Sequence, residues 1–215
     1  MIAVIDYGMG NLRSVQKALE AVGARTLVTS KPADLDKCDK LVFPGVGSFG
    51  AAMKELKRLG LVDPIRKAIE EGKPFLGLCL GLQLLFEKSE EAPGVRGLCI
   101  LDGDVRRFKG PGSGVRGPAL KVPHMGWNSI VKGSRVRGPG SRIMKGVPDG
   151  SFVYFIHSYY VKPKEKRVIL TTTDYGKVFV SGICRDNIFG FQFHPEKSQA
   201  LGLKILRNFV ELCNV

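Results

Sequence analysis

Short apolar runs alternate with amphipathic segments along the first 80 residues of this chain. The runs typical of buried strands are residues 2–5, 26–29, 40–43 and 74–78. The segments with helical periodicity are residues 12–22, 51–59 and 64–71. We expect Asn11 and Asp63 to cap two of these helices, with Gly23 as a stop and Pro64 at a first helical position. Strand–helix–strand repetition predicts a parallel sheet that binds ligands at the carboxyl ends of its strands.

A cysteine stands between glycines where the fourth apolar run meets a helical pattern. Cys79 follows Gly77 and precedes Gly81, and the apolar residues up to Phe86 continue as a predicted buried helix. A nucleophile on a strand-to-helix turn projects above the sheet, and flanking glycines relieve crowding there. The N–H groups that open the next helix favour a thiolate over a thiol. The alternative interpretation of Cys79 is a buried packing residue.

A histidine and a glutamate lie two residues apart near the end of the chain. Residues 189–193 alternate as a strand does, and we expect the strand to end where Pro195 follows His194. In extended backbone, His194 and Glu196 point to the same side. A carboxylate beside an imidazole fixes its tautomer and stabilises the imidazolium. The sequence therefore predicts a nucleophile, a base and an orienting acid, although a lone histidine at a strand end is more often structural.

These residues, in this order, resemble the class I (triad-type) glutamine amidotransferases. Three further segments resemble, within that family, the glutaminase subunit of imidazole glycerol phosphate synthase: residues 6–14 (DYGMGNLRS), 44–47 (PGVG) and 124–128 (HMGWN). The resemblance covers essentially the whole chain. It implies one domain, residues 1–215, with a flavodoxin-like α/β fold: a mostly parallel central sheet flanked by helices, and an additional antiparallel, strand-rich part. The second half of the chain, from residue 98 to 193, is accordingly rich in strand patterns and closes with a helix near 201–212.

The resemblance implies an enzyme that hydrolyses L-glutamine to glutamate and ammonia through a cysteine thioester, without a cofactor or metal. Ammonia then passes to a separate (β/α)₈ cyclase subunit, which makes imidazole glycerol phosphate and an aminoimidazole carboxamide ribonucleotide in histidine biosynthesis. Three alternatives remain: a glutaminase that serves another class I synthase, a non-catalytic basic scaffold subunit, and a cysteine peptidase.

Further site residues are expected around Cys79. The oxyanion donors are the N–H of Leu80 and one from the loop that holds Val46 and Gly47. The resemblance gives Gln83 and Glu91 as the residues that hold the two ends of glutamine. The expected pocket wall is His157, Ser158 and Tyr159. The expected surface for docking the cyclase includes Asn11, His124, Met125, Trp127 and Asn128, although Trp127 suits the core equally well.

Composition excludes several classes of protein. No stretch approaches the roughly 18 consecutive apolar residues that cross a membrane, and residues 1–6 read as a first strand, not a signal peptide. The five cysteines are odd in number and contain no C-x-x-C pair, which argues against a zinc site or a secreted disulfide framework and favours the cytoplasm. Packing or surface positions are expected for Cys38, Cys99, Cys184 and Cys213.

The net charge of +13 is concentrated in one segment. From Asp104 to Lys145 there are ten Lys or Arg residues and one acid. This predicts a solvated surface or an acidic partner, because only Phe108 and Trp127 offer the aromatic platforms that single-strand nucleic-acid binders interleave with basic groups. Within it, the glycine-rich residues 110–118 predict an exposed loop. The start of a dinucleotide fingerprint at residues 8–10 is discounted, since Arg13 stands where its third glycine belongs.

Overall fold

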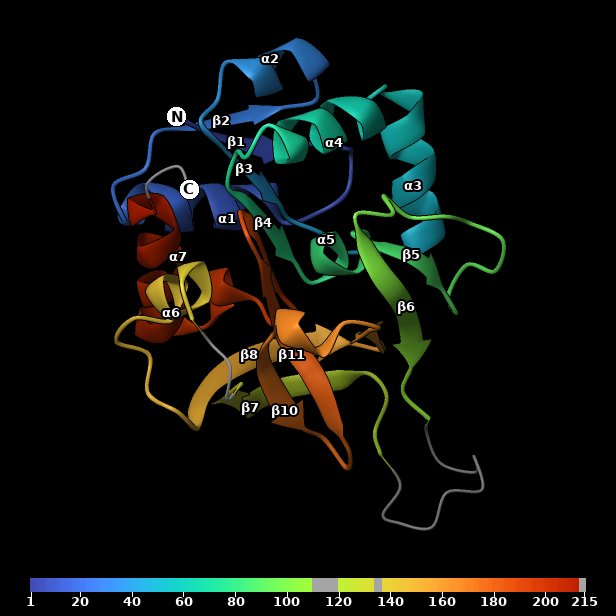
Figure 1. The fold of residues 1–215 in the computed structure, drawn as a ribbon, viewed down its shortest axis with the longest axis vertical. Coiled ribbons are helices and arrows are strands. Elements are labelled where there is room, and N and C mark those ends of the chain that lie inside the picture. Colours follow the sequence, from blue (N-terminus) through green and yellow to red (C-terminus); the bar gives the residue numbers. More distant parts are fainter. Residues whose placement is uncertain (110–119, 134–136, 213–215) are drawn as a thin grey trace.

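The computed structural model describes residues 1–109, 120–133 and 137–212 (Figure 1). Its strands are β1 (Ile2–Ile5), β2 (Thr26–Thr29), β3 (Lys40–Phe43), β4 (Phe75–Leu78), β5 (Phe86–Ser89), β6 (Leu101–Arg107), β7 (His124–Lys132), β8 (Ser151–His157), β9 (Tyr159–Pro163), β10 (Ile169–Asp174), β11 (Val178–Arg185) and β12 (Ile188–Phe191). Its helices are α1 (Leu12–Ala21), α2 (Pro32–Asp36), α3 (Phe49–Arg58), α4 (Val62–Glu70), α5 (Leu80–Gln83), α6 (Pro139–Ile143) and α7 (Gln199–Glu211), with short 3₁₀ turns η1 (Lys166–Val168) and η2 (Pro195–Lys197).

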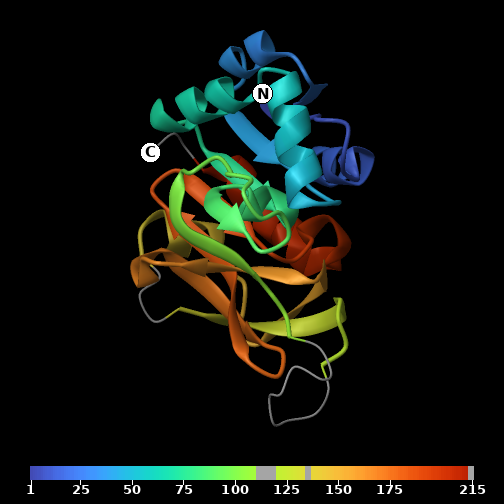
Figure 2. The ribbon, with the colours of Figure 1, turned by 90° about the vertical axis from the view of Figure 1, so that its right-hand side faces the viewer.

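One sheet joins a parallel part to an antiparallel part. The strand order is β2-β1-β3-β4-β12-β11-β10-β7-β8, and β5, β6 and β9 branch from it at β11. Strands β2 to β12 along this order pair in parallel, whereas β12 to β8 pair antiparallel. Figure 2 shows the parallel part, blue to green, above the antiparallel strands. The predicted α/β class, a mostly parallel centre with an added antiparallel part, is confirmed.

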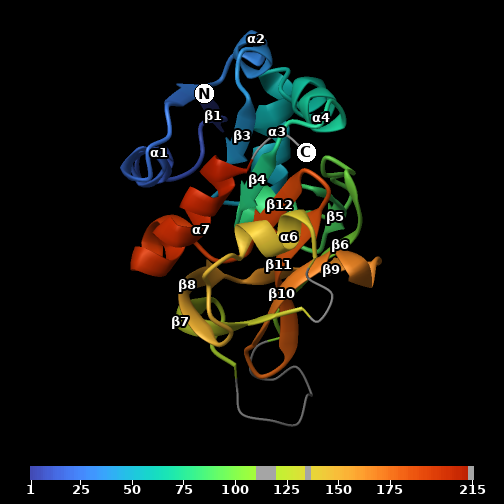
Figure 3. The same ribbon diagram turned by 60° about the vertical axis from the view of Figure 1, so that its left-hand side comes forward.

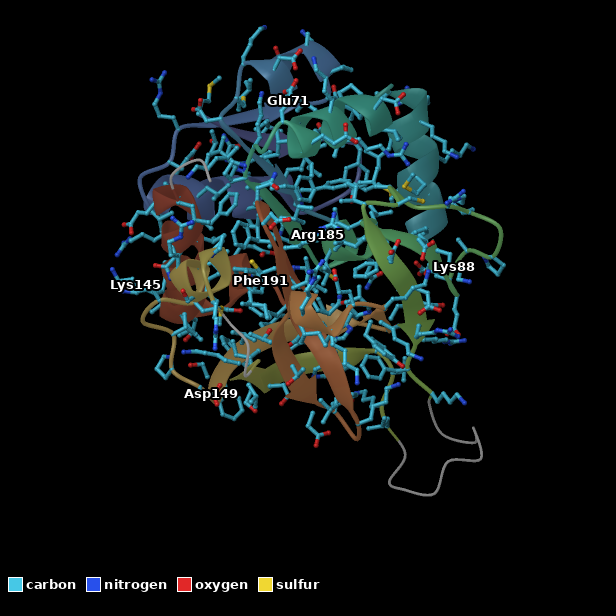
Figure 4. All side chains as sticks on the ribbon, viewed as in Figure 1. Glu71, Lys88, Lys145, Asp149, Arg185 and Phe191 are labelled. Atoms are coloured by element: carbon cyan, nitrogen blue, oxygen red, sulfur yellow. The ribbon has the colours of Figure 1, made fainter. Side chains whose placement is uncertain are left out.

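Two hydrophobic cores cover the two faces of the parallel strands. Successive residues of β1 point to opposite faces, so Ile2 and Val4 join one core while Ala3 and Ile5 join the other. The first core includes residues of α1 and α7, and the second includes residues of α3 and α4. Figure 3 shows these two pairs of helices on opposite sides of the parallel strands. Burial on both faces explains why these strands read as continuous apolar runs. Figure 4 shows Phe191, at the end of β12, in the interior, and charged side chains such as Lys88 and Lys145 at the periphery.

The strand bounds expected for β1, β2 and β3 match the structure, but several helix ends do not. The helix expected over 51–59 begins at Phe49, because the Ser48 hydroxyl accepts the N–H of Ala51 as its cap. The helix expected to start at Pro64 begins at Val62, with Leu61 in place of Asp63 as its cap. Proline is tolerated there because first-turn N–H groups have no partner within the helix. Asn11 precedes α1 as expected, but its side chain makes no capping hydrogen bond.

Two expectations beside the candidate site are wrong. The helix after Cys79 ends at Gln83 instead of continuing to Phe86, because the carbonyls of Leu84 and Leu85 accept N–H groups from residues 98, 100 and 101. The strand expected to reach His194 ends at Phe191, and Pro195 opens the 3₁₀ turn η2. A missing N–H is harmless at the first position of such a turn.

The last helix is held at its carboxyl end by a lysine from β3. The Lys40 ammonium, in the interior, donates to the carbonyls of Phe209 at 3.1 Å and Val210 at 2.6 Å, and also to that of Leu212. A cation at this end of a helix satisfies carbonyls that lack partners and opposes the negative end of the dipole.

Some expectations fall outside the described residues. The predicted loop at 110–118 and Cys213 are among them, as is part of the basic segment. Of the remaining predicted packing cysteines, Cys38 is buried and Cys99 and Cys184 are partly exposed. In the described ranges, no helix combines the length and apolar character that a membrane span requires.

Candidate active site

Cys79 occupies a strained turn between β4 and α5. Its φ of 52° lies in the left-handed region that side chains with a Cβ rarely adopt, and its N–H donates to the Phe191 carbonyl at 2.7 Å. The two flanking glycines are required by close approach. A Cβ on Gly81 would lie 2.0 Å from the Phe43 carbonyl oxygen, and one on Gly77 would lie 2.7 Å from the Gly81 oxygen. This turn therefore lifts a thiol from the carboxyl end of a buried strand, where a parallel sheet binds ligands.

His194 and Glu196 form a buried pair. Nδ1 of His194 lies 2.8 Å from Oε1 of Glu196, and the two side chains are 3% and 2% exposed. The contact arises where η2 begins, because His194 directly precedes this turn and Glu196 lies in it, and not within an extended strand as expected. Ser198 holds the base in place, because its hydroxyl donates to the His194 carbonyl at 2.7 Å and accepts the N–H of Tyr154.

The electrostatics of His194 involve Cys79. Burial acts to lower the pKa of His194, but Cys79 and the Glu196 carboxylate outweigh it and raise the pKa to about 10. His194 Nε2, the nitrogen that faces away from Glu196, is buried without a hydrogen-bond partner among the described residues. The geometry thus presents an imidazole with one nitrogen oriented by a carboxylate and the other available for proton transfer.

A cavity of about 280 Å³ opens at Cys79. The expected residues that line it are Val46, Gly47, Leu80, Gln83, Glu91, His157, Ser158 and Tyr159. Pro123 and Ile156, which sequence analysis did not single out, complete its wall. This volume is below the roughly 300–1,000 Å³ of pockets for drug-sized ligands, so the cavity suits a small substrate.

The cavity residues are held by hydrogen bonds from several elements. The Gln83 amide nitrogen donates to the Tyr159 carbonyl at 3.1 Å and to the Gln192 amide oxygen at 3.2 Å. Glu91 accepts the N–H of Phe49 at 2.7 Å, so this carboxylate also closes the amino end of α3. Glutamine and glutamate usually lie on the surface, but here Gln83 is 4% exposed and Glu91 is partly buried.

The residues expected at a docking surface divide between surface and interior. Met125 is 58% exposed and Trp127 46% exposed, on one side of β7, and Asn11 is also exposed. His124 is 3% exposed, which contradicts a surface position, and Asn128 is partly buried. The reason is strand alternation: residues 124 and 128 point to the side opposite 125 and 127.

An apolar face extends from β7 onto β8. It consists of Met125, Trp127, Val131 and Phe152, which are exposed large hydrophobic side chains. β7 and β8 pair antiparallel, with Ser129 opposite Phe152 and Trp127 opposite Tyr154. Contiguous exposed apolar side chains of this kind mark surfaces that contact another protein.

Two polar residues of the site were missed by sequence analysis. The Gln192 amide nitrogen lies 3.5 Å from the Cys79 sulfur, and its side chain also meets Gln83. A glutamine inside the apolar run 189–193 is the signal that could have revealed it. Ser198 offered no such signal, because its contact with His194 depends on the 3₁₀ turn.

The described part of the chain holds no group of three or more His, Cys, Asp or Glu side chains arranged to bind a metal ion. Cationic side chains gather elsewhere. A cavity of about 650 Å³ beside β6 and β9 is lined by Arg106, Arg107, Lys109, Lys162, Lys166 and Lys177. Among the described residues that line it, the one acid is Glu90, which Arg106 contacts at 2.8 Å. Part of the predicted basic segment therefore contributes to an electropositive surface.

Comparison with known proteins places this geometry in a family. The family model "Glutamine amidotransferase class-I" matches residues 3–213. The chain is 51% identical to a protein of Syntrophotalea carbinolica over 212 residues, which are 99% of this chain and all of that protein. It is 55% identical to a protein of Aquifex aeolicus over 207 residues, 96% of this chain and 94% of that one. Both relatives are named "Imidazole glycerol phosphate synthase subunit HisH".

The fold is also similar to that of a crystal structure described as a glutamine amidotransferase. The TM-score is 0.74 at 20% identity, over the whole length of both chains. At that identity the likeness concerns the fold alone.

Proposed function

The chain belongs to the class I glutamine amidotransferases and, within them, to the HisH subunits of imidazole glycerol phosphate synthase, and we propose that Cys79, His194 and Glu196 carry out its glutaminase reaction. The observation that supports these roles is that the pairing of β4 with β12 brings together two distant segments, the strained Cys79 turn and the buried His194–Glu196 pair. Cys79 also contributes to the raised pKa of His194.

The reaction proceeds in two halves. His194 takes the thiol proton of Cys79 onto Nε2, the Cys79 sulfur attacks the side-chain carbonyl carbon of glutamine, and a tetrahedral oxyanion forms. Collapse of this intermediate breaks the C–N bond, His194 gives its Nε2 proton to the departing ammonia, and a thioester remains. His194 then removes a proton from water, which attacks the thioester carbonyl and releases glutamate and the Cys79 sulfur. Glu196 orients the ring throughout and stabilises the imidazolium.

The oxyanion is held by backbone N–H groups. The Leu80 N–H opens α5 next to the nucleophile, and the second donor comes from the loop of Val46 and Gly47. Gly47 has φ of +109°, a conformation open to glycine, and Val46 is 40% exposed. Losing one such donor typically raises a barrier by about 3–4 kcal/mol.

Glutamine occupies the cavity with its reacting amide toward Cys79. Gln83 and Glu91 hold the amino and carboxylate ends of the substrate, and the wall at His157, Ser158 and Tyr159 supports the chain between them. No cofactor takes part. A cytoplasmic location belongs to this proposal, because the mechanism needs a free thiol.

Ammonia is consumed by a partner. The names of the relatives denote one subunit of a synthase, so we infer a cyclase partner of (β/α)₈ fold that makes imidazole glycerol phosphate and the aminoimidazole carboxamide ribonucleotide. The apolar face of Met125, Trp127, Val131 and Phe152 is the docking surface that we assign to it. A dry path between the subunits keeps ammonia unprotonated, since amines are mostly protonated in water near neutral pH.

Replacement of the nucleophile tests this function. Cys79→Ala should abolish glutamine-dependent synthesis by the complex with the cyclase, whereas synthesis from ammonium salts should persist. Cys99→Ala is the matched control, because Cys99 has the same φ of 52° and lies outside the cavity. Undiminished glutamate release by Cys79→Ala would contradict the mechanism, and absence of glutamate release by the wild-type complex would favour a non-catalytic scaffold.

A further inference from the structure

Two histidines face each other across the β7–β8 pair. His124 and His157 are direct cross-strand neighbours, and Nδ1 of His124 lies 3.0 Å from Nε2 of His157. Both rings are buried, and burial lowers the pKa of His124 to about 4 and that of His157 to about 3. His124 is further clamped between the rings of Phe155 and Tyr175, whose centroids lie 4.8 and 3.9 Å away. Both histidines are therefore neutral, and each carries one ring hydrogen.

The neighbours of the pair determine which nitrogen carries each hydrogen. Nδ1 of His157 lies 2.8 Å from the Tyr159 carbonyl, which can only accept, so this nitrogen is the donor. Nε2 of His157 is then an acceptor and must receive the hydrogen on Nδ1 of His124. Nε2 of His124 is an acceptor in turn, 3.3 Å from the amide nitrogen of Asn128.

The orientation of Asn128 is set independently. Its amide nitrogen also lies 2.9 Å from the Asp174 carbonyl, and its amide oxygen accepts the N–H of Ser129 at 2.8 Å. Each contact admits only one orientation of the amide. The hydrogen bonds thus run in one direction, from Asn128 through His124 and His157 to the Tyr159 carbonyl.

This chain of hydrogen bonds ends at the wall of the glutamine cavity. The Tyr159 carbonyl accepts a second hydrogen bond from Gln83, and the Ile156 carbonyl lies 3.8 Å from the Cys79 sulfur. His157, Ile156 and Tyr159 line the cavity, whereas His124 and Asn128 do not. An incorrect donor in the chain leaves a buried acceptor unpaired and shifts this wall.

We propose that the one-way hydrogen-bond chain Asn128–His124–His157–Tyr159 sets the cavity wall at residues 156–159, so that His124 and Asn128 are positioning residues for glutamine. The proposal rests on the function assigned to this cavity. It gives the buried histidine of the HMGWN segment a role other than contact with the partner.

Two amide replacements of His124, each of which mimics one ring nitrogen, separate the direction of the chain from simple packing. His124→Asn keeps an N–H donor at the position of Nδ1, whereas His124→Gln places its amide at the position of Nε2 and leaves His157 without a donor. We expect the KM for glutamine to rise about tenfold in His124→Gln and less than about threefold in His124→Asn. Asn128→Asp, which cannot donate, should resemble His124→Gln, and association with the cyclase should be unchanged in all three. Equal KM values for the two His124 variants would overturn the proposal.

Nuclear magnetic resonance of ¹⁵N-labelled histidine in the wild-type protein needs no variant. We expect both rings to be neutral and protonated at Nδ1 at neutral pH, and Nε2 protonation of either ring would overturn the chain. Two outcomes distinguish this proposal from the proposed function. Turnover by Cys79→Ala would contradict the function assigned to the cavity, whatever the tautomers of the two histidines. Dependence of glutamine hydrolysis on Cys79, together with a wrong tautomer, would contradict the hydrogen-bond chain alone.

Discussion

The parallel and antiparallel parts of the sheet hold the site by different means. The parallel part contributes backbone: a strained cysteine, N–H groups, and glycines such as Gly81 that let segments approach to contact. The antiparallel part contributes side-chain hydrogen bonds, among them that of the buried pair His124–His157. β12 joins the two, because it pairs with β4 in parallel and with β11 antiparallel.

This difference teaches what each part can tolerate. A backbone site is sensitive to added volume, since interiors are close-packed and a carbonyl cannot retreat from a new methyl group. A hydrogen-bonded site is sensitive to the pattern of donors and acceptors at unchanged volume. Four measurements can sharpen or break this comparison.

The largest effect is expected from Glu196→Gln, which keeps volume and removes charge. The amide can no longer stabilise the imidazolium of His194, so kcat/KM for glutamine should fall about 10³–10⁴-fold. The pKa of His194 should fall with it, because Glu196 is one of the groups that raise it. Steady-state kinetics over a pH range measure both. A loss below about tenfold would show that His194 works without its carboxylate.

Added volume in the parallel part should cost stability. The Cβ in Gly81→Ala would meet the Phe43 carbonyl oxygen at 2.0 Å, and we expect the free energy of unfolding to drop by about 3 kcal/mol or more. Gly50→Ala is the matched control, since it also lies in a helix and its new methyl meets only the Ala92 Cβ at 3.2 Å. Urea denaturation compares the two. Equal stability of both variants would break the comparison.

The exposed apolar face should matter for docking and not for folding. Trp127→Ala should weaken association with the cyclase about tenfold or more, as central aromatic residues of interfaces do, while stability changes by less than about 1 kcal/mol. Val178→Ala serves as control, because Val178 is also an exposed apolar residue and lies on β11, outside this face. Titration calorimetry of both variants measures the difference. Wild-type affinity in Trp127→Ala would show that the cyclase docks on another surface.

The smallest effect concerns acid. Burial lowers the pKa of His124 to about 4, below the ordinary value of 6.5, so the unfolded chain binds a proton that the folded chain does not. Stability contributed by the neutral ring is present above pH 6.5 and is lost as pH falls toward 4. Between about pH 6 and pH 5, the wild type should lose about 1 kcal/mol more than His124→Asn. Parallel losses in both proteins would mean that the ring accepts a proton within the fold.

The sequence predicted some element bounds correctly and others not. The bounds of β1, β2 and β3 were predictable because each is a short apolar run buried on both faces. The ends of helices were not, because contacts distant in sequence set them: the N–H of Phe49 bonds to Glu91, 42 positions along the chain. The end of α5 depends in the same way on residues near 98–101.

Which residues gather at the candidate site was largely predictable, whereas their geometry was less so. The motifs identify Cys79, His194 and the cavity wall, but the His194–Glu196 contact forms through a 3₁₀ turn instead of an extended strand. Strand parity, applied to residues 124–128, would have separated the exposed Met125 and Trp127 from the buried His124. Assigning one role to the whole segment 124–128 overlooks that its alternate residues point to opposite sides of the strand.

The pairing of β4 with β12 makes the geometry of the candidate site depend on the register of these two strands. Gly77 lies opposite Gly190 and Leu78 opposite Phe191, so the sulfur and the imidazole follow from two strands aligned residue by residue. A slip by a single position turns each side chain of a strand to the reverse face. Under the proposed mechanism, release of glutamate therefore requires that these two strands have paired in the correct register.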